Sequence, residues 1–475
     1  MRCRTALGLL AILLIPTSNA LAQAYRVGVD PRVELMSIVF RLAGSGEYTQ
    51  GRVPSYLEAI DRYFGPYRNH PAVQMARELH DTDGVSFDAP MNLAVHLEDV
   101  PSLAERIPFD SPNAGLDERW HGVKARRFVE ALRSFVADTK FTEFLKSQQA
   151  LYDLTNTRLR EFVESNLDLG WYTRFFGVRS PARFIVVPGL VNGGPSYGPS
   201  FVGKDGVKEM YAIPGVWQVD AQGLPRFSGD FLDVTVHEFV HSYANPLVEK
   251  YYAPMAKAGD QLYEPVDSAM RRQAYGDGKT LLYESMVRGA TIRYIFDHQG
   301  AQAARQAIQS ELNNSFLWID DLNELLATYE KDRAKYPTLD SFMPQVVQFF
   351  SNEAPRVGEL ERHYEESRPK VVSLSIANHS QDVDPGLTEI VVKFDRPMRT
   401  VPETQGARDP RFARAHFDST GTILSFGVVL EPGQQYRFSL AWPGGGRLVS
   451  AEGVPMNDYS IEFHTKAAGA KAVSQ

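Results

Sequence analysis

The sequence has little cysteine, no excess of basic residues and no long hydrophobic run beyond its start. Its 475 residues include a single cysteine, Cys3. Because Cys3 lies in a segment that we expect to be removed, the remaining chain has no thiol for a disulfide, a metal ligand or a nucleophile. Lysine and arginine total 50, against 58 aspartate and glutamate residues, for a formal net charge of -8. This acidic balance argues against nucleic-acid binding, which requires a basic surface.

The first 22 residues have the pattern of a secretory signal peptide. Arg2 and Arg4 precede an apolar run from 6 to 15, and Ala20-Leu-Ala22 supplies the small residues of a cleavage site. The apolar run is too short to span a bilayer, and no later run approaches that length. We therefore predict a signal peptide over 1–22, no membrane anchor, and a periplasmic or secreted product.

The rest of the chain predicts an α+β protein whose first domain, residues 23–368, is mostly helical. Apolar residues recur at helical spacing in several segments, at 34–42, from 54, at 117–138, at 142–163 and between 229 and 350. A small sheet is expected from strands at 182–187 and 207–213, which flank a loop rich in glycine and proline. The expected order is therefore a strand, a loop, a second strand and then the helix that carries the motif described below.

Residues 369–467 have a different pattern, which predicts an all-β sandwich. Short alternating segments separated by turns lie at 371–376, 389–394, 423–426, 435–440 and 459–465. The segment resembles bacterial Ig-like domains in Phe394-Asp-Arg-Pro-Met398, Leu430-Glu-Pro-Gly433 and Phe463-His-Thr465. This resemblance implies a spacer or a module that binds a surface glycan or protein. Residues 468–475 are small and polar, and a disordered tail is expected there.

One motif carries chemistry. His237-Glu-Phe-Val-His241 is an HExxH sequence in an apolar segment, which predicts a helix that Pro246 ends. Residues i and i+4 lie one turn apart on the same face, so both imidazoles can bind one Zn²⁺. Glu238 lies beside the metal and can take a proton from a water that the metal activates. Two imidazoles and a carboxylate in an apolar helix would be costly to bury without such a partner.

A catalytic zinc site usually needs a third protein ligand. The candidates downstream are Glu249, Asp260, Glu264, Asp267, Glu284 and His298. Glu284 is preferred, because it lies in a segment, 281–294, that is apolar on most faces of the expected helix. The alternative is an ordinary ion pair between Glu284 and Arg288, four residues later.

This ligand scheme resembles that of the gluzincins, in which HExxH is followed by a glutamate on a later helix. Ala244 and Leu247 replace the glycine and third histidine of the longer metzincin motif. Thermolysin-like gluzincins carry an acid four residues after the third ligand, where this chain has Arg288. From 27 to about 350 the chain also resembles an uncharacterised family of secreted bacterial proteins with this zinc motif, on 32–36, 192–198 and 283–288. That resemblance implies a metallopeptidase-like fold.

The zincin architecture implies an antiparallel edge strand that holds extended peptide by backbone pairing. Either 182–187 or 207–213 could be that strand, with Tyr197 of the loop between them either bonding substrate or buried as a structural residue. A group that stabilises the oxyanion is also needed. The candidates are Tyr251, Tyr252, Arg288 and Arg293.

Together these features predict a secreted zinc metallopeptidase acting on a peptide or protein substrate. His237, His241 and Glu284 are the expected Zn²⁺ ligands, and Glu238 is the expected general base. The alternative is a non-catalytic secreted binding protein with a zincin-like fold, which recognises a glycan or a surface protein. The presence of Glu238 favours the enzyme, because a site without hydrolysis has no need of that carboxylate. A zinc hydrolase acting on another kind of bond is a third possibility.

Overall fold

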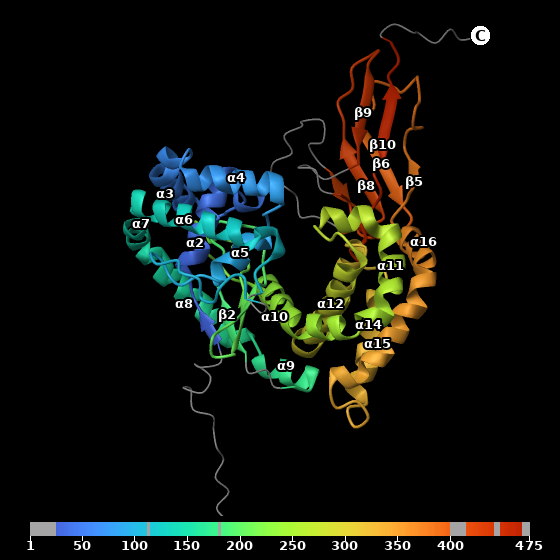
Figure 1. The fold of residues 1–475 in the computed structure, drawn as a ribbon. Helices are drawn as coiled ribbons and strands as arrows, with labels where there is room; N and C mark the ends of the chain where they lie inside the picture. The colour runs from blue at the N-terminus through green and yellow to red at the C-terminus, as the bar shows by residue number, and fades with distance from the viewer. Residues whose placement is uncertain (1–24, 112–114, 179–181, 400–414, 441–446, 468–475) are drawn as a thin grey trace, which may run out of the picture. The chain divides into compact units, whose positions relative to one another are not determined.

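The computed structural model describes residues 25–111, 115–178, 182–399, 415–440 and 447–467 (Figure 1). The predicted signal peptide, residues 1–22, and the predicted tail, 468–475, lie outside these ranges. Contacts divide the chain into two units, residues 1–247 with 337–340 and residues 248–336 with 341–475. Many helices, one small mixed sheet and a C-terminal set of antiparallel strands confirm the α+β class.

The helices of the first unit include all those predicted there, but the expected 142–163 helix is divided at Gln148. They are α2 (Pro31–Ala43), α3 (Pro54–Phe64), α4 (Pro71–Asp83), α5 (Asp88–Val95), α6 (Gly122–Asp138), α7 (Phe141–Ser147), α8 (Gln149–Asn166) and α9 (Leu169–Phe176). Short 3-10 helices lie at Gly46–Tyr48, Gly65–Tyr67 and Glu118–Trp120.

Helix α2 is the central helix of this unit. Asp30 caps its start by accepting a hydrogen bond from Arg32 N, and Pro31 occupies the first turn, where a missing N–H costs nothing. Every residue from 32 to 40 is buried, and the helix packs against α4 and α5. The two charges that enter the core with it are paired, because Arg32 Nη2 lies 2.6 Å from Asp30 Oδ2.

Glu34, also on α2, is a fully buried acid that accepts its hydrogen bond from a neutral group. Tyr56 donates this bond to its Oε2, and the Tyr56 hydroxyl lies 2.8 Å from that of Tyr152. Burial disfavours the carboxylate and raises the pKa of Glu34 to about 8, despite the hydrogen bond from Tyr56. The unit therefore holds Glu34 as a neutral acid at neutral pH.

The sheet of the first unit has the strand order β1-β2-β4-β3. Its strands are β1 (Tyr25–Val27), β2 (Arg183–Val186), β3 (Ser200–Val202) and β4 (Lys208–Ala212). The pairs β1–β2 and β2–β4 are parallel, with Phe184 opposite Met210, whereas β3 is antiparallel to β4. The two predicted strands are confirmed as β2 and β4, but both are interior. The edge strands, β1 and β3, were not predicted.

Helix α10 (Gly229–Lys250) carries the HExxH motif. The prediction that Pro246 ends it is wrong, because the helix continues for four residues beyond this proline. A proline removes one backbone hydrogen bond, and the bonds on either side of it can hold the helix together. Aromatic rings fix α10 on its neighbours, since Phe239 lies 4.7 Å from Phe184 of β2 and Tyr243 stacks at 4.6 Å on Phe176 of α9.

The second unit begins with helices grouped around α12. They are α11 (Tyr252–Arg272), α12 (Gly278–Gln299), α13 (Ala301–Asn313), α14 (Ile319–Lys331), α15 (Leu339–Glu353) and α16 (Val357–Ser367), with a 3-10 turn at Ala354–Arg356. Helix α12 packs against α11, α13 and α14. At the start of α12, Gly278 touches the backbone of Gly259 so closely that neither helix has room for a side chain there. Among the described helices of the chain, none is long and apolar enough to cross a membrane.

The second unit ends in two antiparallel sheets, with strand orders β5-β6-β8-β7 and β10-β9. Their strands are β5 (Val371–Leu374), β6 (Glu389–Phe394), β7 (His416–Phe417), β8 (Ile423–Gly427), β9 (Gln435–Ser439) and β10 (Ser460–His464). Ile390, Phe426 and Phe463 belong to the core that both sheets share. The five predicted strands are confirmed. The boundary at 368/369 coincides with the change from helix to strand, and both this domain boundary and the Ig-like assignment stay predictions.

The buried Glu34 predicts a pH-dependent stability. Its pKa is about 8 in the folded chain, against an ordinary value of 4.5, so between these values the folded state holds a proton that the unfolded state releases. The free energy of unfolding therefore falls as pH rises through this window, by at most about 1.4 kcal/mol per pH unit. In Glu34→Gln this contribution is absent. Thermal unfolding of both proteins between about pH 5 and about pH 8 should show the Tm of the wild type falling relative to that of the variant. If the Tm values of the two proteins change with pH in parallel, the raised pKa of Glu34 is contradicted.

Candidate metal centre

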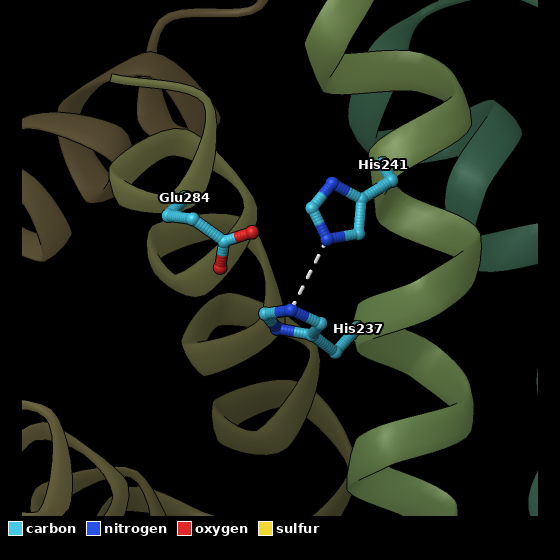
Figure 2. Close-up of side chains that lie close together, drawn as sticks. All are labelled: His237, His241 and Glu284. Carbon is cyan, nitrogen blue, oxygen red and sulfur yellow. Dashed lines mark hydrogen bonds between the residues drawn. The ribbon is translucent and has the colours of Figure 1, made fainter. Parts of the chain in front are cut away.

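The two histidines of the motif lie one turn apart on α10 and turn the same nitrogen toward each other. His237 Nε2 and His241 Nε2 are 3.2 Å apart, with the two rings nearly perpendicular at 82° (Figure 2). Two imidazole nitrogens that bind one tetrahedral zinc at its usual bond length lie about 3.3 Å from each other. The spacing of the two Nε2 atoms therefore fits a shared metal ion.

A hydrogen bond on the far side of His241 sets the role of this ring. Its Nδ1 lies 3.2 Å from Asn245 Oδ1, one turn further along α10. An amide oxygen only accepts, so Nδ1 carries the hydrogen and donates it. The lone pair of His241 is then on Nε2, the nitrogen that faces His237, which is the arrangement found in metal-binding histidines.

Glu284 of α12 completes a possible metal-binding triad. Its carboxylate points toward the two imidazole rings (Figure 2). One ligand atom from each of His237, His241 and Glu284 lies within 4.8 Å of the others. Two imidazoles and a carboxylate form a donor set that suits Zn²⁺. These are the three residues that the sequence predicted as ligands, and their role as metal ligands stays a prediction.

The other candidates for the third ligand have different surroundings. Glu249 accepts hydrogen bonds from Tyr283 and, at 2.8 Å, from Lys279. Asp267 pairs with Arg271 on its own helix, and His298 Nδ1 bonds the carbonyl of Tyr294. Asp260 and Glu264 are exposed. Within the described part of the chain, none of these five residues joins a three-ligand group.

Two side chains of the second unit hold one oxygen of Glu284. The Tyr275 hydroxyl donates to Oε2 at 3.1 Å, and Arg288 Nη2 lies 3.3 Å from the same atom. Glu284 itself is 6% exposed. Burial and the nearby Glu284 carboxylate raise the pKa of Tyr275 above its usual value, so its hydroxyl keeps the proton that it donates.

Arg288 is fixed in turn by its own neighbours. It donates to Glu311 and to the Tyr275 hydroxyl, the latter at 2.9 Å, and its guanidinium lies 4.4 Å from the centre of the Phe316 ring. The ion pair with Glu284 that the sequence left as an alternative is therefore present, and it exists together with the triad. Arg288 restricts the Glu284 carboxylate by this direct contact.

The arginines suggested as oxyanion stabilisers both have acidic partners. Arg288 pairs with Glu284 and Glu311, and Arg293 Nη2 lies 2.6 Å from Glu330 Oε2. Sequence reasoning did not find Tyr275 or Asn245 as supports of the ligands. The only signal for Asn245 is its position one turn after His241, and Tyr275 has none, because it precedes α12 and reaches Glu284 only through the fold.

Glu238, the proposed general base, lies next to His237 on α10 and is 9% exposed. Its Oε2 occupies the place that a side chain at Gly198 would need. The neighbouring Tyr197 is 4% exposed, and its ring lies 6.0 Å from that of Tyr48 in the core of the first unit. Burial, with smaller contributions from nearby acids that include Glu238, raises the pKa of the Tyr197 phenol. The structural role for Tyr197 is therefore favoured over contact with substrate.

The expectation that 182–187 or 207–213 forms an antiparallel edge strand is wrong. These segments form β2 and β4, which have neighbours on both sides in the order β1-β2-β4-β3. The antiparallel edge strand is β3, which begins at Ser200 within the segment predicted as a loop. The bridge between Tyr197 and Ile213 extends the same pairing toward Gly198.

This protein is therefore an α+β protein with a candidate divalent-metal centre. Two histidines and one carboxylate, all carried by helices, form that centre. The chain matches the family described as a domain of unknown function, DUF4932, over residues 25–349, and it belongs to that family. No curated protein and no solved structure matches the chain. The triad lies inside the matched range, whereas β5 to β10 lie beyond it.

The contacts around Glu284 predict that Tyr275 contributes to metal affinity. In Tyr275→Phe, Oε2 of Glu284 loses one hydrogen bond, and zinc affinity should fall by about tenfold, as for other groups that orient a ligand. Tyr263→Phe is the matched control, because the Tyr263 hydroxyl donates to the backbone oxygen of Tyr275 and not to the ligand. Competition with a coloured chelator measures both affinities. Equal affinities in the two variants would refute the positioning role of Tyr275.

Proposed function

We propose that this chain is a secreted zinc-dependent metallopeptidase. The observation that carries the proposal is the convergence of His237 Nε2, His241 Nε2 and the Glu284 carboxylate, with Glu238 adjacent on the same helix as the histidines. The donor set fits zinc, and a buried carboxylate next to the histidine pair fits a general base. A zinc ion bound there would supply Lewis-acid activation of water and of the scissile carbonyl.

The protein's own residues then carry the proton transfers. Glu238 accepts a proton from the attacking water while the oxygen of that water bonds to the carbonyl carbon. Glu238 then delivers this proton to the leaving nitrogen as the carbon–nitrogen bond breaks. His241 is held in the ligating tautomer by Asn245, and Glu284 is held by Tyr275 and Arg288. Each of these contacts restricts a ligand before substrate arrives.

An extended peptide is the substrate that best fits the sheet. Among the described strands, β3 has β4 on one side only, so the backbone of Ser200–Val202 can pair with a further strand. This edge begins two residues after Gly198, which touches Glu238. A peptide paired with β3 would therefore run close to the proposed base.

Replacement of the base tests the catalytic assignment. Glu238→Gln keeps the shape of the side chain but cannot accept a proton, so hydrolysis of casein or of a fluorogenic peptide library should fall by about 10²–10⁴-fold. Zinc content should stay near that of the wild type. Glu249→Gln is the control, because it makes the same change at an exposed position of the same helix. Undiminished turnover by Glu238→Gln would exclude Glu238 as the base, and a wild type that binds zinc without hydrolysing any peptide would favour a binding protein.

Replacement of a ligand tests the metal assignment. His237→Ala removes one of the two nitrogens that the proposal gives to the metal, so the purified variant should lose its zinc by elemental analysis. His298→Ala is the control. His298 lies on α12 outside the triad, so this variant should keep its zinc. A zinc content unchanged in His237→Ala would reject this ligand.

A further inference from the structure

The segment Tyr197–Pro199 is a fixed part of the sheet of the first unit. The Tyr197 N–H donates to the Ile213 carbonyl at 3.2 Å, and the Ile213 N–H donates back to the Tyr197 carbonyl at 2.8 Å. On the other side of Gly198, the Tyr211 N–H donates to the carbonyl of Pro199 at 3.0 Å. Because the residues on both sides of Gly198 are bonded to the β4 region, its backbone cannot easily move away from whatever packs on it.

Glu238 is what packs on it. A Cβ at Gly198 would overlap Oε2 of Glu238 and would also lie 3.4 Å from Cβ and from Cδ of the same side chain. All three of the nearest atoms therefore belong to Glu238. The backbone conformation of Gly198 lies outside the left-handed region, so a side chain there would disturb the contact with the carboxylate and not a turn.

Helix α10, which carries Glu238, is anchored on the sheet by the residue that follows Glu238. Phe239, the next residue, is fully buried and lies 4.7 Å from the Phe184 ring of β2. Two elements of the same unit thus approach each other from opposite sides, the bonded loop at Gly198 and the anchored helix at Glu238. The Glu238 side chain lies between them and is 9% exposed.

We infer that Gly198 is a positioning residue that holds the Glu238 carboxylate in place by backbone contact. This inference rests on the proposed function, in which Glu238 is the general base. Absence of a side chain at 198 lets the fixed loop support the carboxylate without displacing it. A methyl group there would push the carboxylate aside, and a displacement of about 1 Å at a reacting group can cost about 100-fold in rate.

Kinetics of Gly198→Ala and Gly229→Ala test this role. Gly229, the first residue of α10, has no atom near its Cβ position, so the control adds the same methyl group to open space. Gly198→Ala should lower kcat by about 100-fold with KM and zinc content unchanged, whereas Gly229→Ala should match the wild type. Wild-type kcat in Gly198→Ala would overturn the inference. A wild type without peptidase activity would instead count against the proposed function.

A thermal-stability cycle tests the contact itself and needs no activity. Gly198→Ala should lower Tm when Glu238 is present, and it should have a much smaller effect in a Glu238→Ala background, where the colliding carboxylate is absent. The cycle compares the wild type, both single variants and the double variant. An equal loss of Tm in both backgrounds would show that the added methyl collides with something other than Glu238, and would overturn the inference even if kcat falls.

Discussion

The approach of two imidazole nitrogens and a buried carboxylate is the constraint on which the rest of the site depends. The Glu284 carboxylate is 6% exposed and is costly to desolvate without a positive partner, whereas the two imidazoles, whose Nε2 atoms lie 3.2 Å apart, are partly exposed. Arg288 supplies positive charge to Glu284 but also pairs with Glu311. A divalent ion between the three residues would contact both imidazole nitrogens and the carboxylate at once.

The elements that carry the ligands are held by contacts inside their own units. Phe239 and Tyr243 attach α10 to β2 and α9, while the close approach of Gly259 and Gly278 sets α12 against α11. Side chains on such helices are more restricted than side chains on loops, which suits a metal centre that must hold a fixed geometry. The loop at Gly198 adds a rigid surface on the side of the proposed base.

The three residues of the candidate triad could be predicted from the sequence because each leaves a local signal. His237 and His241 show helical spacing, and Glu284 is a charge in an otherwise apolar helix. The edge strand β3 could not be predicted, since three residues are too few to show alternation, and β1 is equally short. Tyr275 and Gly198 act through contacts made by the fold, so no pattern around them indicates a role. Pro246 misled the prediction because a helix packed on a core can tolerate one lost hydrogen bond.

Anomalous diffraction at the zinc edge, from crystals of the purified protein grown with zinc, measures the metal's position directly. We predict a single strong peak at about 2.0–2.2 Å from the Nε2 atoms of His237 and His241 and from one carboxylate oxygen of Glu284. Crystals that show zinc elsewhere, or zinc on the two histidines with the Glu284 carboxylate outside bonding distance of the metal, would contradict the three-ligand centre.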